Sequence, residues 1–396
     1  MFLAAAPYFQ SRFRDNESIL THFQSSITSV SCITNLTSTL LLSKMQSKAS
    51  YPGRIVSSLF LNIVVFSLLT ISTSYFLNIS SSTYLAFTLL MVFAASIATG
   101  LCQNGTFAFA AGFGRPEYIQ AIMTGQGVAG VLPSVAQILS VLAVPEPDHW
   151  DDTPSEQAAM SNESTTSAFI YFLTATGISA FTLVAVLPLA LKFIWKQNSQ
   201  IVASVTGTDD DVRRNERKVV SMITLYMKLN WLPLSIFICF LVTMFFPVFT
   251  QKVLSVVPAD TAPRILQPAT FIPLGFLAWN VGDLVGRLLT VVTISFKPRP
   301  VILFLFALLR VGFIPLYFLC NLEGKGAVVN SDIFYLLIVQ VGFGATNGLL
   351  GSSTMMAAQH YVDKTELEAT GGFMALNLVA GLTAGSLLSF TISGVS

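Results

Sequence analysis

Long apolar segments alternate with short polar ones along almost the whole chain. Ten segments are long enough to cross a bilayer, at approximately residues 19–43, 55–77, 84–111, 119–144, 168–195, 226–250, 268–295, 300–320, 332–359 and 369–393. A spanning helix needs about 20 apolar residues, and backbone in lipid must satisfy its own hydrogen bonds, as a helix does. No strand-length alternation with a period of two is seen. The pattern predicts an all-α integral membrane protein with ten complete spans.

The first ten residues are apolar, but they are too few to span a membrane and lack the basic start of a signal peptide. We interpret them as the end of a further spanning helix whose beginning is missing. With this incomplete first helix, the predicted arrangement is six spans followed by five.

Lysine and arginine are unevenly distributed between the two sets of loops. If segment 1–10 ends outside, the inside loops hold 14 basic residues and the outside loops 5, while Arg287 and Arg310 lie within spans. Cytoplasmic loops are enriched in these residues, so the bias predicts the orientation. The acidic loop 145–167 then lies outside. Three sequons also lie outside and are candidate glycosylation sites, at Asn16, Asn78 and Asn162.

One inside connection, residues 196–225, is much longer and more polar than the others. Its low hydrophobicity and high charge are typical of a flexible linker. The sequence therefore predicts an N-terminal bundle at 1–195, comprising the remnant of the first span and five further spans. A cytosolic linker at 196–225 and a C-terminal bundle of five spans at 226–396 follow. No convincing repeat relates the two halves.

Composition agrees with a membrane protein. Hydrophobic residues make up 53% of the chain and charged residues 10%, against about 25% charged in soluble domains. The net charge of +1 gives no indication of nucleic-acid binding. The four cysteines lie in apolar segments without CxxC spacing, and the three histidines form no ligand motif. We therefore expect no metal site and no cofactor.

The sequence contains no set of residues typical of an enzyme. We find no paired carboxylates, no Ser/His/Asp set and no Gly-rich phosphate loop in its spans or loops. An enzyme is the least favoured function class, and primary pumping is not expected without an ATP-binding motif.

Charged and amide side chains deep within spans are expensive in lipid and are functional candidates by default. Asp283 and Arg287 are four residues apart, so they share a helix face, and Asn280 lies on the same face. One interpretation is an ion pair that only fixes helix packing. We favour the other, in which this polar stripe lines a substrate cavity, because a purely structural pair is easily replaced by apolar packing.

Arg310 is a second deep charge, and Asp283 is the other deep carboxylate available to it. An Asp283–Arg310 contact therefore competes with the Asp283–Arg287 pair, and we expect a gating or structural role for Arg310. Gln103 and Asn104 are deep amides that either bind a heterocycle or bridge helices, whereas Asn347 is expected to hold helices together.

Glycines in several spans indicate close helix packing, and they also permit the helix sliding that a transporter needs. The glycines that we single out are Gly125, Gly127, Gly130, Gly282 and Gly286. Glu366 and Glu368 begin the last span, where the helix dipole favours carboxylates. A contact of these two residues at a cytosolic gate is the alternative.

Several of these segments resemble the equilibrative nucleoside transporter family. The run WNVGDLVGR at 279–287 is similar to the family signature Asn-x-x-Asp-x-x-Gly-Arg. The run MTGQGVAG at 123–130 resembles the family's fifth helix, and EATGGFMA at 368–375 resembles the start of its eleventh. Residues 112–118 and the short linker are similar to fungal members. The resemblance runs through essentially the whole chain.

The resemblance implies an eleven-helix, six-plus-five bundle related to the major facilitator design. It implies facilitative transport of purine and pyrimidine nucleosides by alternating access, with Asp283 and Arg287 contacting the ribose hydroxyls. Asn280 and Phe276 would lie beside them. Asn104 or Gln103 would correspond to the family's base-contacting glutamine. Membrane lipid is the expected surrounding, and no obligate protein partner is evident. A plasma membrane and a vacuolar-type membrane both fit the sequence.

Two other functions remain open from the sequence. One is the transport of nucleobases or another small polar solute on the same fold. The other is a membrane protein that does not transport, such as a receptor-like sensor or a truncated product, because the missing part of the first helix would leave a gap beside the cavity.

Overall fold

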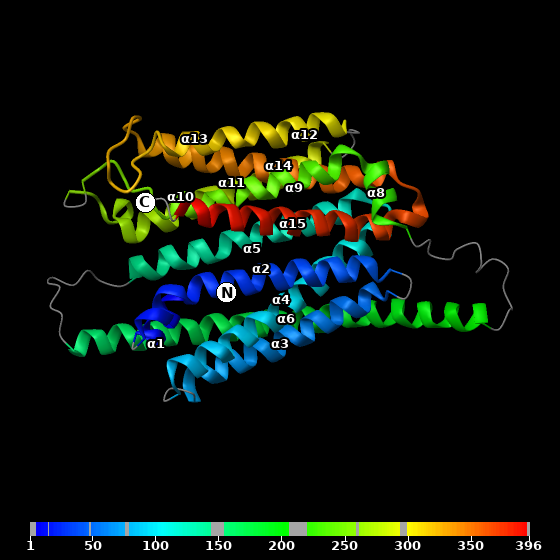
Figure 1. Ribbon diagram of the computed structural model, residues 1–396, viewed down its shortest axis with the longest axis horizontal. Coiled ribbons are helices and arrows are strands. Elements are labelled where there is room, and N and C mark those ends of the chain that lie inside the picture. The colour runs from blue at the N-terminus through cyan, green and yellow to red at the C-terminus, as the bar shows by residue number, and fades with distance from the viewer. Residues whose placement is uncertain are drawn as a thin grey trace. The chain divides into compact units, whose positions relative to one another are not determined.

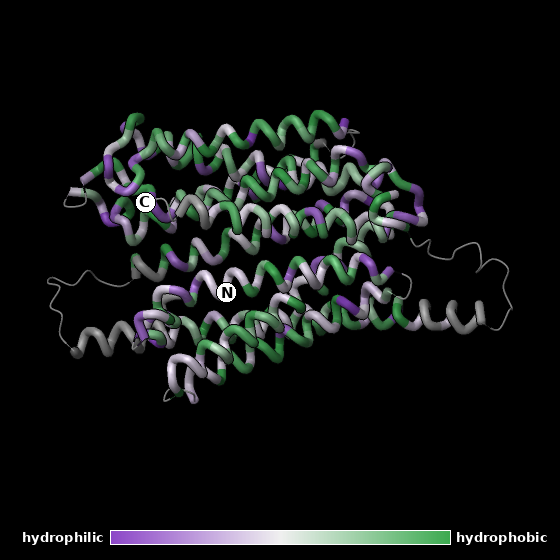
Figure 2. The backbone as a smooth tube through the Cα atoms, in the orientation of Figure 1, coloured by the Kyte–Doolittle hydropathy of each residue, from purple (hydrophilic) through white to green (hydrophobic). Residues whose placement is uncertain are grey.

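The computed structural model describes residues 5–14, 16–46, 49–75, 79–143, 154–205, 220–258, 261–293 and 299–393. The described part is almost entirely helical, and Figure 1 shows the helices as long ribbons. Nine helices are long and apolar enough to span a membrane within these residues. Apolar residues cover most of their length, as Figure 2 shows in green. The predicted multi-pass helical membrane protein is confirmed.

The tenth predicted span, at 19–43, forms a long helix, α2 (Glu17–Lys44), but it is not among the nine. Serine and threonine interrupt its apolar residues, and several of their hydroxyls donate to carbonyls one turn earlier, such as Thr21 to Glu17 and Thr28 to Gln24. Such bonds make these residues tolerable in a helix without making the helix apolar.

The chain divides into two compact units, residues 1–106 with 147–218, and residues 107–146 with 219–396. The first contains α1 (Ala6–Phe13), α2, α3 (Tyr51–Tyr75), most of α4 (Ser81–Ala111) and α6 (Pro154–Val205). Its core is aromatic and includes Phe9, Phe13, Tyr84 and Phe172. Tyr84 also bonds Tyr8 at 2.9 Å and Ser72 at 3.1 Å through its hydroxyl.

The second unit contains the remaining helices. These are α5 (Pro116–Ala143), α8 (Met222–Leu229), α9 (Trp231–Thr243), α10 (Phe245–Thr250), α11 (Pro268–Thr293), α12 (Pro300–Leu309), α13 (Phe313–Tyr317), α14 (Gly342–Ala357) and α15 (Leu367–Ser393). Short turns η1 (Arg264–Leu266), η2 (Arg310–Gly312), η4 (Ala358–Tyr361) and η5 (Lys364–Glu366) connect them, and η3 (Phe334–Val341) is a π-helix before α14.

Helix α5 has its contacts with α11 and α14 and is grouped with the second unit. The sequence instead places this helix in an N-terminal bundle at 1–195, followed by a C-terminal bundle at 226–396. These two bundles remain a prediction. The linker predicted at 196–225 is helical through Val205, where α6 ends. Residues 206–219 lie outside the described residues.

Two predicted spans are interrupted. The span at 226–250 breaks after α8, where Asn230 has a positive φ of 54°, and again after Thr243, whose carbonyl loses its helical donor because residue 247 is proline. The span at 300–320 tightens into the 3-10 turn η2 before α13, which contains Pro315. Proline and left-handed backbone therefore explain both breaks.

Buried glycines let α11 and α14 lie backbone to backbone. A Cβ on Gly282 or Gly286 would meet the carbonyls of Val341 or Ala345, and a Cβ on Gly344 or Gly348 would meet α11 in the same way. Gly127 and Gly130 of α5 similarly approach Arg287 and Asn280, whereas a Cβ on Gly125 would meet nothing within 4 Å. The expected close packing is thus found at four of the five glycines singled out, but not at Gly125.

The structure describes the backbone of two of the three candidate glycosylation sites, Asn16 and Asn162. Asn16 caps the N-terminus of α2, and its side chain accepts from the Ile19 amide at 3.2 Å. Asn162 falls within α6, but its side chain lies outside the described residues, as does Asn78 altogether.

We predict that Gly286→Ala lowers the melting temperature of the purified protein, because the added methyl would overlap backbone of α14. Overpacking of this kind costs about 1–3 kcal/mol. The matched control is Gly125→Ala, which has open space around it and should be neutral or stabilising by up to about 1 kcal/mol. Equal melting temperatures for the two variants in detergent would contradict the close packing of α11 on α14.

Candidate functional site

The polar stripe predicted on residues 280–287 lies on α11 and is buried in the second unit. Arg287 Nε donates to Asp283 Oδ2 at 2.6 Å, an i,i+4 ion pair in which both residues are about 5% exposed or less. The helical spacing explains why the two side chains meet. The predicted Asp283–Arg287 contact is therefore confirmed.

Both partners of this ion pair also bond to other helices. Arg287 Nη1 donates to the Met123 carbonyl of α5 at 2.7 Å and lies 3.4 Å from Gln126 Oε1. The second oxygen of Asp283, Oδ1, accepts from Asn347 Nδ2 of α14 at 2.7 Å. A buried charge is tolerated only when its hydrogen-bonding capacity is used, and here both charges have partners on neighbouring helices.

Asn347 extends this set of contacts to Arg310. Its Oδ1 lies 2.7 Å from Thr243 Oγ1 of α9. Arg310 in turn donates to the Cys239 carbonyl at 2.6 Å and to Thr243 Oγ1 at 3.3 Å. We call the set Asp283, Arg287, Asn347, Thr243 and Arg310 the buried polar network. It connects α5, α11, α14, α9 and η2.

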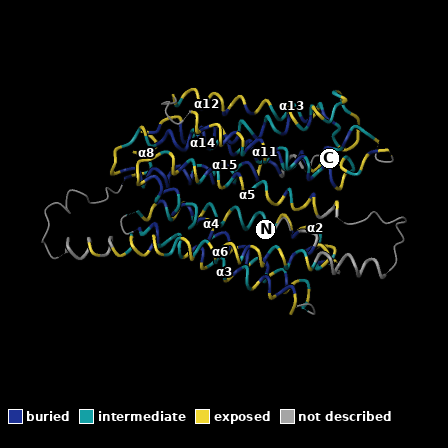
Figure 3. The backbone as a smooth tube through the Cα atoms, turned by 180° about the vertical axis from the view of Figure 1, so that it is seen from behind, coloured by how far each residue is buried: buried dark blue, intermediate teal, exposed yellow. Residues whose placement is uncertain are grey.

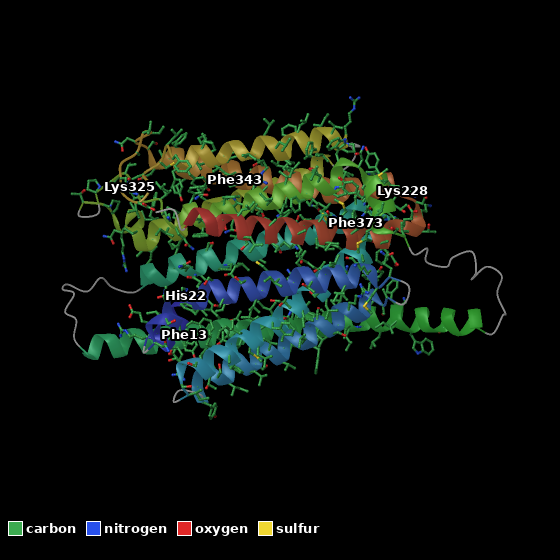
Figure 4. All side chains as sticks on the ribbon, in the orientation of Figure 1. Phe13, His22, Lys228, Lys325, Phe343 and Phe373 are labelled. Atoms are coloured by element: carbon green, nitrogen blue, oxygen red, sulfur yellow. The ribbon has the colours of Figure 1, made fainter. Side chains whose placement is uncertain are left out.

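The competition for Asp283 is resolved in favour of Arg287. Among the described residues, no ion pair includes Arg310. Its guanidinium instead bonds Thr346 at 3.3 Å and lies 4.8 Å from the centre of the Phe343 ring. Phe343 is labelled in Figure 4, within the second unit. Carbonyl, hydroxyl and π contacts thus replace the carboxylate, in keeping with the structural role expected of Arg310.

Asn280 and Phe276 lie one turn apart at the next level of α11. Asn280 Nδ2 donates to the Phe276 carbonyl at 2.8 Å and lies 3.4 Å from Ser134 Oγ of α5. Phe246 of α10 packs edge-on against Phe276 and stacks at 4.2 Å on Trp279. Asn280 and Arg287 therefore both contact helix α5, and Asn280 lies beside an aromatic cluster.

The indole of Trp279 is a polar feature that sequence reasoning missed. Its Nε1 is buried and has no hydrogen-bond partner among the described residues. Buried donors without a partner are rare and call for an explanation such as a bound ligand or water. The position of Trp279 next to Asn280 in the signature was the available signal.

Gln103 and Asn104, on α4 in the first unit, have different environments. Asn104 is 1% exposed, donates to Ser43 Oγ at 3.2 Å, and accepts a very short bond from Arg54 Nη1. The Oε1 of Gln103 is buried and accepts no hydrogen bond from any residue that the structure describes. Asn104 thus bridges α2, α3 and α4, whereas Gln103 retains an unused acceptor.

Glu366 has local partners at the start of the last span. It is 1% exposed, bonds Lys228 Nζ at 2.6 Å, and forms a capping box with Asp363 around η5. The hydrogen bond to Glu366 raises the pKa of Lys228, which is labelled in Figure 4 at that end of the second unit. Glu368 lies in the first turn of α15, where a Cβ on Gly112 would meet its side chain. The gating role of both glutamates stays a prediction.

Metal binding has no support in the described part of the chain. No group of three His, Cys, Asp or Glu side chains there lies close enough to hold an ion. The four cysteines form no disulfide within the described residues, and Cys239 packs against Arg310.

Comparison with known proteins gives concordant matches. The family model described as nucleoside transporter matches residues 89–393. Nucleoside transporter FUN26 of Saccharomyces cerevisiae is 31% identical over 98% of this chain and 80% of its own length. Equilibrative nucleoside transporter 1 of Rattus norvegicus is 27% identical over 89% of this chain and 78% of its own.

A solved structure supports the expected fold. The fucose:proton symporter FucP of E. coli superposes with a TM-score of 0.56 at 13% identity, covering 100% of this chain and 94% of that one. A second FucP structure, described as a major facilitator superfamily transporter in the outward conformation, has a TM-score of 0.54. The fold is therefore a major-facilitator-like helical bundle.

The family profile, which covers the α11 signature and most of the chain, and the fungal relative at 31% identity agree with the resemblance seen in the sequence. They also place the chain among transporters and not among enzymes. The chain belongs to the nucleoside transporter family.

Proposed function

We propose that this protein carries nucleosides across a membrane, down their concentration gradient, by alternating access. The observation that carries the proposal is the polar stripe of half-buried Asn280 and buried Asp283 and Arg287 within a family of nucleoside transporters. A carboxylate accepts hydrogen bonds and a guanidinium donates them, so together they match the vicinal hydroxyls of a ribose. Polar side chains this deep in a membrane protein commonly mark a substrate pathway.

The contacts of the stripe suggest how a substrate reaches it. In the structure, α5 contacts Arg287 through the Met123 carbonyl and Gln126. Gly127 and Gly130 of α5 also lie against Arg287 and Asn280, and so do the side chains of Met123 and Ser134. Withdrawal of α5 would break the bonds from Arg287 to the Met123 carbonyl and Gln126, and it would leave donors on Arg287 for which ribose hydroxyls are suitable replacements.

The position of α5 in the chain suggests why it would move away from α11. Helix α5 precedes the long connection between the predicted halves, yet it packs on α11 of the second. If the N-terminal half moves as one body during alternating access, it takes α5 away from α11 and uncovers the ion pair. The structure then corresponds to a state in which the pair is closed.

For recognition of the base we favour Gln103 over Asn104. The Asn104 amide is held by Ser43 and Arg54, whereas Gln103 has a buried acceptor without a partner among the described residues. A nucleobase amine or ring N–H would supply the missing donor.

We predict that Asp283→Asn and Arg287→Ala each reduce uptake of labelled uridine and adenosine into proteoliposomes at least about tenfold, or about 1.4 kcal/mol. The control is Lys325→Gln, whose side chain is 75% exposed and whose uptake should equal that of the parent. Wild-type uptake by both Asp283→Asn and Arg287→Ala would rule out the assigned site.

The double variant Asp283→Leu/Arg287→Met separates a transport role from a packing role. Breaking one side of a buried pair costs about 3–5 kcal/mol, whereas replacing both partners with apolar residues is often neutral. We expect the double variant to melt above Arg287→Ala but below the parent, because Asn347 loses its acceptor on Asp283, and still to fail to transport. Recovery of uptake in the double variant would show that the pair serves packing alone.

We predict that Gln103→Leu alters the ratio of uridine to adenosine uptake without lowering the melting temperature. Asn104→Leu should instead lower the melting temperature, since it leaves Ser43 and Arg54 without one partner and such losses cost about 1–3 kcal/mol. Competition by free nucleobases in the same assay tests the alternative substrate class. If Gln103→Leu instead lowered the melting temperature and Asn104→Leu altered the uptake ratio, Asn104 and not Gln103 would be the base-contacting residue.

A further inference from the structure

A large apolar groove lies between α12 and α14, apart from the contacts of Asp283. Its volume is about 500 Å³, and most of its lining is apolar, including Ile302, Phe306, Leu349 and Met356. The two helices run side by side in Figure 1 and pack on one another. Several lining residues of α12 are exposed, as the yellow segments of α12 in Figure 3 show. The groove therefore opens on the outside of the second unit.

The groove uses the face of α14 that points away from α11. Gly344 and Gly348 face α11, whereas Thr346 and Ser353 line the groove. Residues spaced in this way lie on opposite sides of a helix. Because the segment spans a membrane, a surface of this kind is in contact with lipid and not with water.

The length and position of the groove match one leaflet. It extends along α14 and η4 from Thr346 to His360, which at 1.5 Å per residue is about 21 Å. One leaflet of a bilayer, with its headgroup region, is about 20–22 Å thick. By the predicted orientation, the loop after His360 is cytosolic, so the groove runs from the membrane interior to the cytosolic surface.

The two ends of the groove differ in how their basic residues are held. At the inner end Arg310 forms part of the wall, but its guanidinium is held by Cys239, Thr243 and Thr346. At the cytosolic end, His360 is exposed, and the exposed Arg299 precedes α12 one turn before Ile302. Basic residues at this level attract anionic headgroups of the cytosolic leaflet. The chemistry is thus apolar along the length and basic at the mouth.

We propose that this groove is a lipid site, in which one acyl chain of an anionic phospholipid lies between α12 and α14 with its headgroup at Arg299 and His360. The acyl chain fills a void that would otherwise lack packing partners, and voids of this kind weaken a structure. The lipid would hold α12 against the helix that carries Asn347, and so couple lipid composition to the buried polar network.

The test uses the full chain in phosphatidylcholine liposomes that contain a trace of photoreactive lipid with a diazirine in one acyl chain. The reactive lipid is phosphatidylserine in one sample and phosphatidylcholine in the other, and labelled peptides are mapped by mass spectrometry. We expect phosphatidylserine to label the α12 and α14 peptides about fivefold more, the preference that one basic side chain near an anionic lipid provides.

Three variants locate the site. Ser353→Trp places a large side chain in the groove and should reduce labelling of α12 and α14 by phosphatidylserine about fivefold. Val292→Trp, on an exposed position of α11 outside the groove, is the matched control and should label as the parent does. Arg299→Gln should bring the two lipids to nearly equal labelling, because it removes the basic side chain at the mouth.

Equal labelling of the parent chain by the two lipids would overturn the headgroup assignment, and this comparison needs no variant. Labelling of folded Ser353→Trp at the parental level would overturn the acyl-chain assignment. Labelling spread evenly over all spanning helices would mean that the groove has no preference over the rest of the lipid-facing surface, which also contradicts the proposal.

Discussion

The ion pair between Asp283 and Arg287 is the interaction on which the second unit depends. Two charges in the interior of a membrane protein are stable only if every donor and acceptor finds a partner. Here Asp283 shares its oxygens between Arg287 and Asn347, and Arg287 reaches a carbonyl of α5. The same chain of contacts continues through Thr243 to Arg310. The polar groups therefore fix the mutual positions of four helices and one turn.

The glycines of α11 and α14 make this network possible. Because Gly286 and Gly348 allow the two backbones to approach closely, the short side chain of Asn347 reaches Asp283. The glycines of α5 lie mainly against side chains, since a Cβ on Gly127 would meet Arg287 and Leu284 and one on Gly130 would meet Asn280. The buried polar network thus lies where α5 packs on α11, with the glycines of α5 against the side chains of Arg287 and Asn280.

The sequence predicted the parts of the site that local spacing determines. The positions of Asp283 and Arg287 determine that they meet on one helix face, and the shortage of charge predicts the membrane spans. Contacts between distant segments were not predictable in this way: Asn347 is 64 residues from Asp283, and the α5 carbonyl at Met123 leaves no trace in a residue pattern. The choice between Gln103 and Asn104 likewise needed their neighbours, because adjacent amides look alike until Ser43 and Arg54 are placed. The breaks at Asn230 and Pro247 alter helix continuity without changing hydrophobicity, so a count of apolar residues passes over them.

The most direct test of the account asks whether the α11 stripe faces a wet substrate pathway. Single cysteines at Asn280, on the stripe, and at Val285, an exposed position of α11, can be treated with a charged methanethiosulfonate in membranes, with the parent chain as background. The account predicts that Asn280→Cys reacts and that uridine protects it, whereas Val285→Cys lies in lipid and does not react. An Asn280→Cys protein that is folded but unreactive, or that reacts equally with and without uridine, would contradict the central claim.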